Sequence, residues 1–309
     1  MKNSFKTILV LWGALTASSA SALDYGEIVK TRIADLVNIN STTATAGGPK
    51  ACVDRYQKLY KDGVLNIAVG FGYWDNSPDE YVFDQFIANG FRNNLVAPCS
   101  PGMNVCGFTR TGDVFRKMVR GPDGKMNRLT ISITYGTLST DNLKNTTINR
   151  VQQYAKCEAA TEKYFSEVSR GSEVVMYIGH ARDGGGPDFC PPVRKSDKHT
   201  DYDWYRKAAP GFKKLLSAME TSRSNGRENQ MVGLYSCYSR RHFHNKMAAK
   251  IPDAGYVLTD VEITSQDAIA SVATTIDAII GHKCVKSFAE GLRLSPGVKM
   301  HGMFTKSSP

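Results

Sequence analysis

The sequence predicts an α/β fold with three layers, in which a mostly parallel sheet carries helices on both faces. Segments rich in valine, isoleucine and leucine alternate with longer segments whose apolar residues recur every three or four positions. The first kind is nearly continuous in apolar character, which is typical of strands that are buried on both faces. Strands that alternate with helices along the chain indicate βαβ units and a parallel sheet.

The first half of the chain begins with a predicted helix over residues 25–38 and a Ser/Thr/Gly-rich loop over 40–49. Residues 63–72, GVLNIAVGFG, are the first predicted strand, because valine and isoleucine favour a pleated, buried backbone. Residues 79–91 have helical spacing, and a glycine near their end indicates where the helix stops. Residues 128–136, RLTISITYG, are the second predicted strand.

The middle of the chain continues the alternation. Residues 142–169 carry a long pattern of helical period. Residues 173–179, EVVMYIG, are the third predicted strand, and residues 230–236, QMVGLYS, are the fourth. Between them, residues 203–221 are predicted to be helical in at least their second half.

The last predicted elements are a short helix over residues 241–250, a fifth strand over 254–260 and an apolar helix over 265–281 that ends on a glycine. The chain shows no internal repeat of fixed period and no low-complexity tract. We interpret residues 63–309 as one α/β domain and residues 23–62 as an N-terminal segment.

Residues 1–22 have the three regions of a secretory signal peptide. Two lysines give a basic start, residues 7–17 are apolar, and Ala20 and Ala22 form an A-x-A cleavage site. The apolar region is too short to span a bilayer, which takes about 20 residues. We expect cleavage after Ala22, a secreted or periplasmic location, and a mature protein that does not span a membrane.

Charge and cysteine content limit the classes of partner and compartment. The net charge of +10 favours contact with acidic cell-surface material. The chain has no long basic run and no aromatic–basic motif, so nucleic acid is not an expected partner. Seven cysteines in an oxidising compartment allow up to three disulfides and leave one thiol. Cys99 and Cys106 can close a small loop, and the other pairings stay open.

Two consecutive predicted strands end in residues that can do chemistry. The third strand leads into His180, and the fourth leads into Cys237. Consecutive parallel strands usually lie side by side, about 4.8 Å apart, and ligands of open α/β sheets bind beyond their carboxyl ends. A thiol needs a base to attack a carbonyl carbon, and imidazole titrates near neutral pH. We therefore predict a catalytic dyad of Cys237 and His180.

The backbone around these residues offers candidates for an oxyanion hole. Three glycines follow His180 closely, and glycine lets the backbone approach a substrate. Amide groups there, at Ala181 and at Cys237 are predicted to hold the developing negative charge. Asp183 and Asp260 lie near the expected cleft and are candidate substrate-binding residues. No metal and no cofactor are predicted.

The two strand ends resemble those of the caspase–legumain–gingipain clan of cysteine peptidases. In that clan one hydrophobic strand ends in the catalytic histidine and the next in the catalytic cysteine, in the same order as VVMYIGH and VGLYSC. The resemblance extends over roughly residues 63–282. It implies a caspase–hemoglobinase-like fold and endopeptidase activity on peptides or proteins. It also implies that Asp260, at the end of the following strand, lines a pocket that favours Arg or Lys before the cut bond.

The same residues have other interpretations. Cys237, His242 and His244 are potential zinc ligands, but their spacing fits no standard signature, and residues i and i+2 do not share a helix face. The segment GHARDGGG matches no phosphate-binding motif, and Ser236 lacks the G-x-S-x-G pattern of a nucleophile elbow. The main alternative is a non-catalytic secreted or periplasmic binding protein of the same fold, related to the peptidases but inactive.

Overall fold

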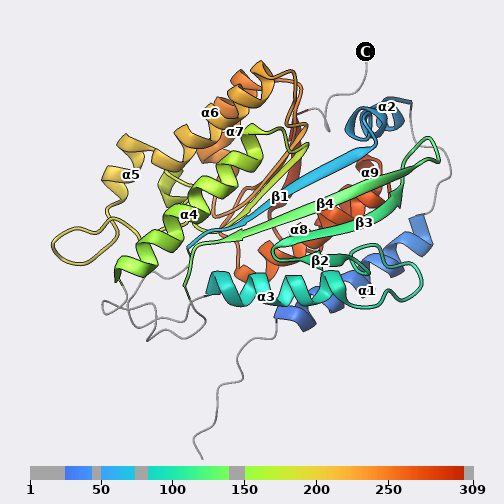
Figure 1. Ribbon diagram of the computed structural model, residues 1–309, viewed down its shortest axis with the longest axis horizontal. Coiled ribbons are helices and arrows are strands. Elements are labelled where there is room, and N and C mark those ends of the chain that lie inside the picture. The colour runs from blue at the N-terminus through green and yellow to red at the C-terminus, as the bar shows by residue number, and fades with distance from the viewer. Residues whose placement is uncertain (1–24, 44–49, 74–82, 139–149, 303–309) are drawn as a thin grey trace, which may run out of the picture.

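A single mixed sheet forms the centre of the computed structural model, which describes residues 25–43, 50–73, 83–138 and 150–302 (Figure 1). The predicted signal peptide lies outside these residues. The strands of the sheet are β1 (Val64–Phe71), β2 (Thr109–Thr111), β3 (Val114–Arg120), β4 (Met126–Tyr135), β5 (Val174–Ile178), β6 (Met231–Tyr235), β7 (Gly255–Thr259) and β8 (Val298–Gly302). Their order across the sheet is β2-β3-β4-β1-β5-β6-β7-β8.

The five strands that the apolar runs predicted form the parallel centre of this sheet. Strands β4, β1, β5, β6 and β7 pair in parallel with one another in that order. Strands β5, β6 and β7 are buried at every position, which agrees with their continuous apolar sequences. Strands β2, β3 and β8 were not predicted; they pair antiparallel at the two edges of the sheet.

Helices pack on both faces of the sheet and give the α/β layers that were expected. They are α1 (Tyr25–Thr43), α2 (Lys50–Leu59), α3 (Phe83–Val96), α4 (Arg150–Ser169), α5 (Tyr202–Ala208), α6 (Pro210–Ser224), α7 (Ser239–Lys250), α8 (Ser265–Ile280) and α9 (Val285–Leu292). One core cluster joins the sheet to α1, α2, α3, α8 and α9, and a second joins it to α4, α6 and α7. Figure 1 shows α4 on one side of the sheet and α8 on the other.

The N-terminal segment shares the first of these cores. The Tyr25 hydroxyl lies 2.9 Å from the Ser265 hydroxyl at the start of α8. A disulfide joins Cys52 of α2 to Cys284, directly before α9. The loop predicted over residues 40–49 is wrong for 40–43, which continue α1, while 44–49 lie outside the described residues. Helix α2 was not predicted.

Two helix boundaries differ from the prediction for identifiable reasons. Helix α3 continues past Gly90 to Val96, so this glycine does not end the helix. A side-chain carbon on Gly90 would lie 2.7 Å from the backbone nitrogen of Gly26, so glycine is needed where α1 crosses α3. The helix predicted over residues 203–221 is broken at Ala209, whose φ of 42° lies in the left-handed region. Pro210 then begins a second helix.

The cysteines form three disulfides and leave one thiol. The pairs are Cys52–Cys284, Cys99–Cys106 and Cys157–Cys190, and Cys237 is free. The expected short loop between Cys99 and Cys106 is therefore present. Within the described ranges, no helix combines the length and apolar character that crossing a bilayer requires.

Candidate active site at the ends of β5 and β6

The register of the sheet brings His180 and Cys237 to the same edge. Strands β5 and β6 are direct parallel neighbours, and Ile178 is paired with Tyr235 at their carboxyl ends. His180 and Cys237 each follow the last paired residue of their strand by two positions. Since adjacent strands lie about 4.8 Å apart, the two residues leave the sheet side by side.

Cys237 lies in a short turn between β6 and α7. The residue that follows it, Tyr238, has a left-handed backbone with φ 51°, and its N–H donates to Val261 O at 3.0 Å. Helix α7 then begins at Ser239, whose hydroxyl donates to Leu234 O at 2.6 Å. The Cys237 side chain is half-buried, and its Sγ lies 4.0 Å from Ile263 O. The turn thus holds a free thiol in a defined place at the edge of the sheet.

His180 begins a loop that packs tightly against the neighbouring strand. A side-chain carbon on Gly179, the residue before it, would lie 2.5 Å from the Tyr177 hydroxyl and 3.2 Å from Gly72 Cα. The Tyr177 hydroxyl accepts a hydrogen bond from Asp188 N–H at 3.0 Å and lies 3.3 Å from His180 O. The backbone on either side of His180 is therefore fixed by close packing. The imidazole itself is half-buried.

The three glycines after His180 close the loop on itself, which corrects part of the oxyanion-hole prediction. The N–H groups of Gly184 and Gly186 both donate to Ala181 O at 3.0 Å, and Gly185 N–H donates to Arg182 O at 2.9 Å. These amides are used inside the loop and cannot also serve a substrate. A side-chain carbon on Gly186 would lie 2.7 Å from His180 O, so glycine is required by this close approach.

The other two predicted oxyanion donors remain available. Of the described residues, none accepts a hydrogen bond from the backbone N–H of Ala181 or of Cys237. Ala181 directly follows His180, and Cys237 lies at the end of the adjacent strand. A backbone N–H group without an acceptor in the protein is a natural binding point for an oxygen atom.

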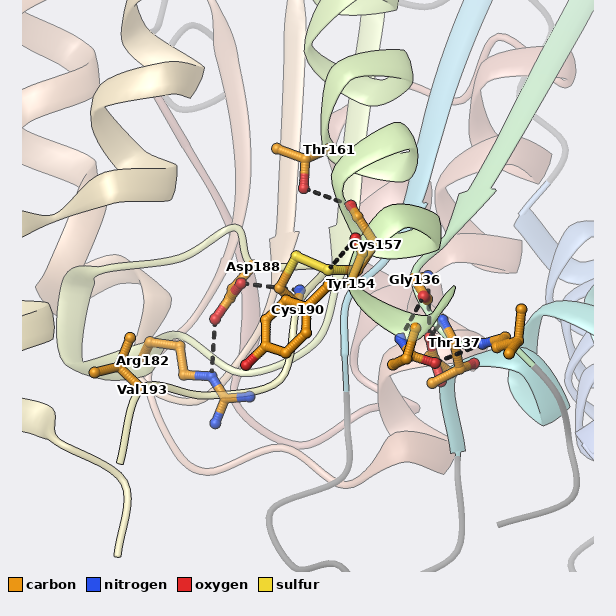
Figure 2. The surroundings of a disulfide bond; sticks show 12 residues. Gly136, Thr137, Tyr154, Cys157, Thr161, Arg182, Asp188, Cys190 and Val193 are labelled. Atoms are coloured by element: carbon orange, nitrogen blue, oxygen red, sulfur yellow. Dashed lines mark hydrogen bonds and ion pairs between the residues drawn. A yellow bond between two sulfur atoms is a disulfide. The ribbon is translucent and has the colours of Figure 1, made fainter. Parts of the chain in front are cut away.

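A buried arginine that was not predicted from the sequence organises the His180 loop. The Arg182 side chain has no exposed surface, and its Nε lies 3.4 Å from Asp188 Oδ2 (Figure 2). The Tyr205 hydroxyl donates to the same oxygen at 2.8 Å. Burial raises the pKa of Tyr205, and the neighbouring Asp188 carboxylate raises it further, so the hydroxyl stays protonated and donates. The Arg-Asp spacing has no recognised motif that would have revealed this pair.

A disulfide anchors the far end of the same loop. The Cys190 N–H donates to Asp188 Oδ1 at 3.1 Å, and Cys190 is bonded to Cys157 of α4. Figure 2 shows the disulfide beside the Arg182–Asp188 pair, with α4 rising above it. The loop that begins at His180 is thus held by an ion pair in its middle and a covalent bond at its end.

The turn at the carboxyl end of β4 depends on a buried carboxyl group that was also missed. Asp84 of α3 accepts hydrogen bonds from Gly136 N–H at 3.1 Å and from Thr137 N–H and hydroxyl at 3.0 and 2.7 Å. These bonds hold the turn that follows β4. Burial raises the pKa of Asp84 to about 6, although the hydrogen bonds act in the opposite direction.

Asp183, a predicted substrate-binding residue, lies in contact with two basic side chains. Its carboxylate pairs with Arg206, and one oxygen lies 3.7 Å from His242 Nε2. Burial lowers the pKa of His242, and this effect exceeds the opposing effect of the Asp183 carboxylate. His242 is therefore neutral at pH 7, and Arg206 provides the main counter-charge of Asp183.

Asp260 is likewise paired within the protein. One carboxylate oxygen lies 3.1 Å from Arg240 Nη1, and the other lies 2.9 Å from Lys299 Nζ. Partial burial acts to raise the pKa of Asp260, but hydrogen bonds from Lys299 and Arg240 outweigh it and the pKa is lowered. A substrate Arg or Lys would have to displace these two cations, so this site gives no support to the expected basic preference.

The two histidines of α7 face different surroundings. His242 lies against Asp183. The centroid of the His244 ring, in contrast, lies 5.3 Å from that of the His301 ring and 5.4 Å from that of the Tyr256 ring. Residues i and i+2 of a helix point apart, so this divergence is expected. Among the described residues, no group of three or more His, Cys, Asp or Glu side chains is arranged to hold a metal ion.

Comparison of the chain with family models, with curated proteins and with solved structures gave no match.

Proposed function

We propose that the protein is a cysteine endopeptidase in which Cys237 is the nucleophile and His180 is the general base. The observation that carries this proposal is the parallel register of β5 and β6, because His180 and the free Cys237 each lie two residues beyond the end of one of these neighbouring strands. The order of the two residues and the strand that ends at each also agree with the resemblance to the caspase–legumain–gingipain clan. On this basis we propose a caspase–hemoglobinase-like arrangement for the sheet.

The proposed reaction begins with transfer of the thiol proton from Cys237 to His180. The thiolate attacks the carbonyl carbon of a peptide bond, and the oxygen becomes negatively charged. The N–H groups of Ala181 and Cys237 are the proposed donors to this oxyanion. His180 then gives its proton to the leaving amine as the C–N bond breaks, which leaves a thioester on Cys237.

Hydrolysis of the thioester completes the cycle. His180 takes a proton from water, the hydroxide attacks the thioester carbonyl, and the C–S bond breaks with release of a carboxylic acid product. The Cys237 thiolate then recovers its proton. No group outside the two side chains, the amides and water is required. The rigid loop from His180 to Cys190 supports this proposal, because a general base works only when it is held in hydrogen-bonding reach.

A secreted or periplasmic location is part of the proposal. Three disulfides fit an oxidising compartment, since they are rare in reducing ones. The basic start, apolar stretch and A-x-A site of residues 1–22 favour the same location. A free thiol in such a compartment is unusual unless it has a chemical role.

The experiment compares wild type with Cys237→Ala and His180→Ala on a broad peptide library. Loss of a covalent nucleophile should lower hydrolysis by several orders of magnitude while the circular dichroism spectrum is unchanged. His244→Ala is a matched control, because it removes a nearby imidazole that faces His301 instead of the β5–β6 edge. Alkylation by iodoacetamide should modify Cys237 in wild type and slow markedly in His180→Ala.

The results separate the peptidase from the inactive binding protein. If wild type hydrolyses no peptide, and Cys237 reacts with iodoacetamide at the same rate with and without His180, the dyad is not functional. The non-catalytic alternative then holds. Equal loss of activity in His244→Ala and His180→Ala would also contradict the assignment of the base.

A further inference from the structure

The face of β3 and β4 on the α4 side of the sheet is open to solvent along part of its length. Residues 114–120 of β3 and 126–129 of β4 alternate between more exposed and more buried positions, as expected when one face is covered, whereas residues 131–134 of β4 are all buried. Phe115, Val119 and Leu129 point into the core that contains α3 and α8. Figure 1 shows α8 and α9 behind these strands, while α4 lies over another part of the sheet.

The exposed positions of this face are arginine and methionine. They are Arg116, Met118 and Arg120 on β3 and Met126 and Arg128 on β4, which we call the arginine–methionine face. The two methionine side chains are each 54% exposed, which is high for such large apolar groups.

The register makes these residues alternate in two dimensions. Met118 is directly opposite Arg128, and Arg120 is directly opposite Met126. Along β3, Arg116 and Arg120 flank Met118 at a distance of about 13 Å from each other, since a strand rises about 3.3 Å per residue. Each methionine therefore has an arginine directly across from it on the other strand and another arginine two residues away on its own strand. The aliphatic parts of the arginines extend the apolar area between the charges.

The positive charges of the face are not balanced by the protein. Among the described residues, no ion pair involves Arg116, Arg120 or Arg128. The carboxylate in the turn between the strands, Asp123, lies 3.4 Å from Lys125, so it is already accompanied by a cation. Arg120 donates to the backbone oxygen of Gly124 at 2.8 Å, but no carboxylate of the described residues neutralises any of the three guanidinium groups. Three such charges on one face attract an anionic partner.

We propose that the arginine–methionine face binds the surface of a bilayer that contains anionic phospholipids. Arginine is suited to this role because its planar guanidinium forms paired hydrogen bonds with phosphate groups. The methionines between the arginines lie where an apolar side chain enters the boundary between headgroups and acyl chains. An anionic polymer in solution would bind the arginines equally well, but it would bury little of the two exposed methionine side chains.

Vesicle sedimentation tests the proposal with the expected mature chain, which begins after Ala22, and with its disulfides intact. The protein should bind vesicles of phosphatidylcholine and phosphatidylglycerol, should bind pure phosphatidylcholine vesicles much more weakly, and should be released by salt. Each arginine near an anionic surface contributes about fivefold, so Arg116→Gln/Arg120→Gln/Arg128→Gln should lower the partition coefficient by roughly 100-fold. Met118→Ser/Met126→Ser, with all charges retained, should lower it by roughly tenfold.

A control with the same loss of charge separates a local face from general basicity. Lys207, Lys213 and Lys214 on α5 and α6 are exposed and have no carboxylate partner among the described residues. Their triple change to glutamine should leave vesicle binding nearly unchanged. An equal loss in this control would overturn the proposal, as would a failure of wild type to bind. Arginine-dependent binding that is insensitive to the methionine changes, and is matched by binding to heparin, would identify an anionic polymer instead.

Discussion

Replacement of Arg182 by methionine should destabilise the fold by about 3 kcal/mol, because it leaves the carboxylate of Asp188 without its buried counter-charge. Removing one member of a buried ion pair typically costs ~3–5 kcal/mol. The Arg182 side chain has no exposed surface, whereas that of Asp188 is 16% exposed. After the change, Asp188 still accepts from the Tyr205 hydroxyl at 2.8 Å and from Cys190 N–H at 3.1 Å. These contacts put the expected cost near the lower end of the range.

A double-mutant cycle isolates the ion pair from the packing of the two side chains. Asp188→Asn should cost about 4 kcal/mol, since it leaves a fully buried guanidinium opposite a neutral amide. The double variant should be more stable than the sum of the single changes predicts, by about 2 kcal/mol, because neither charge is then left alone. Methionine suits the arginine position because its unbranched chain fills most of the same space.

Equilibrium unfolding in urea, with the three disulfides intact, measures all four proteins. Arg206→Met is the matched control, since it removes an arginine from a more exposed pair with Asp183 in the same loop and should have no measurable effect. The argument that this pair holds the His180 loop would be refuted if each single variant lowered the free energy of unfolding by less than about 1 kcal/mol and the two effects were additive in the double variant.

Three other predictions concern the rest of the fold. Because the pKa of Asp84 is raised from 3.8 to about 6 in the fold, its contribution to the free energy of unfolding is fully present below 3.8 and is lost as the pH rises through about 6. Asp84→Asn should therefore flatten the pH dependence of urea unfolding over that interval, and an unchanged slope would refute it. Gly90→Ala should destabilise the protein although alanine favours helices by about 1 kcal/mol, because the added carbon would lie 2.7 Å from Gly26 N; a rise in melting temperature would contradict this. Replacing Cys52 and Cys284 by alanine opens a loop of 232 residues and should cost about 5 kcal/mol, which thermal unfolding at neutral pH can test against wild type.

The strand pair that leads to His180 and Cys237 was accessible from sequence for simple physical reasons. A strand that is buried on both faces must be apolar throughout, so VVMYI and MVGLY could be recognised without any tertiary information. Both strands run in the same direction and follow each other in the chain, which made them expected neighbours. The positions of His180 and Cys237 at one edge follow from these two facts.

The edge strands were missed because their patterns are mixed. Strand β3 alternates, but Lys117 occupies one of the positions between Phe115 and Val119 that should be apolar. The ammonium group of Lys117 is tolerated there because it donates to Asn104 O at 3.0 Å and to Cys106 O at 2.8 Å. Those two acceptors lie in the preceding loop, and no pattern in the sequence indicates that this loop contacts the strand. Local periodicity cannot reveal a polar residue whose partners are supplied by distant backbone.

What the sequence by itself determined is the alternating α/β plan, its apolar central strands, and the presence of one cysteine more than disulfides can pair. What only the tertiary structure decided is how the polar groups around the candidate site are used. The glycine amides after His180 bond within their own loop, Arg182 is buried against Asp188, and Asp260 is paired with Lys299 of another strand. The physical reason is that the two kinds of interaction act over different separations along the chain. Apolar burial leaves a repeating mark along the chain, whereas each hydrogen bond or ion pair joins two particular atoms that only the fold brings together.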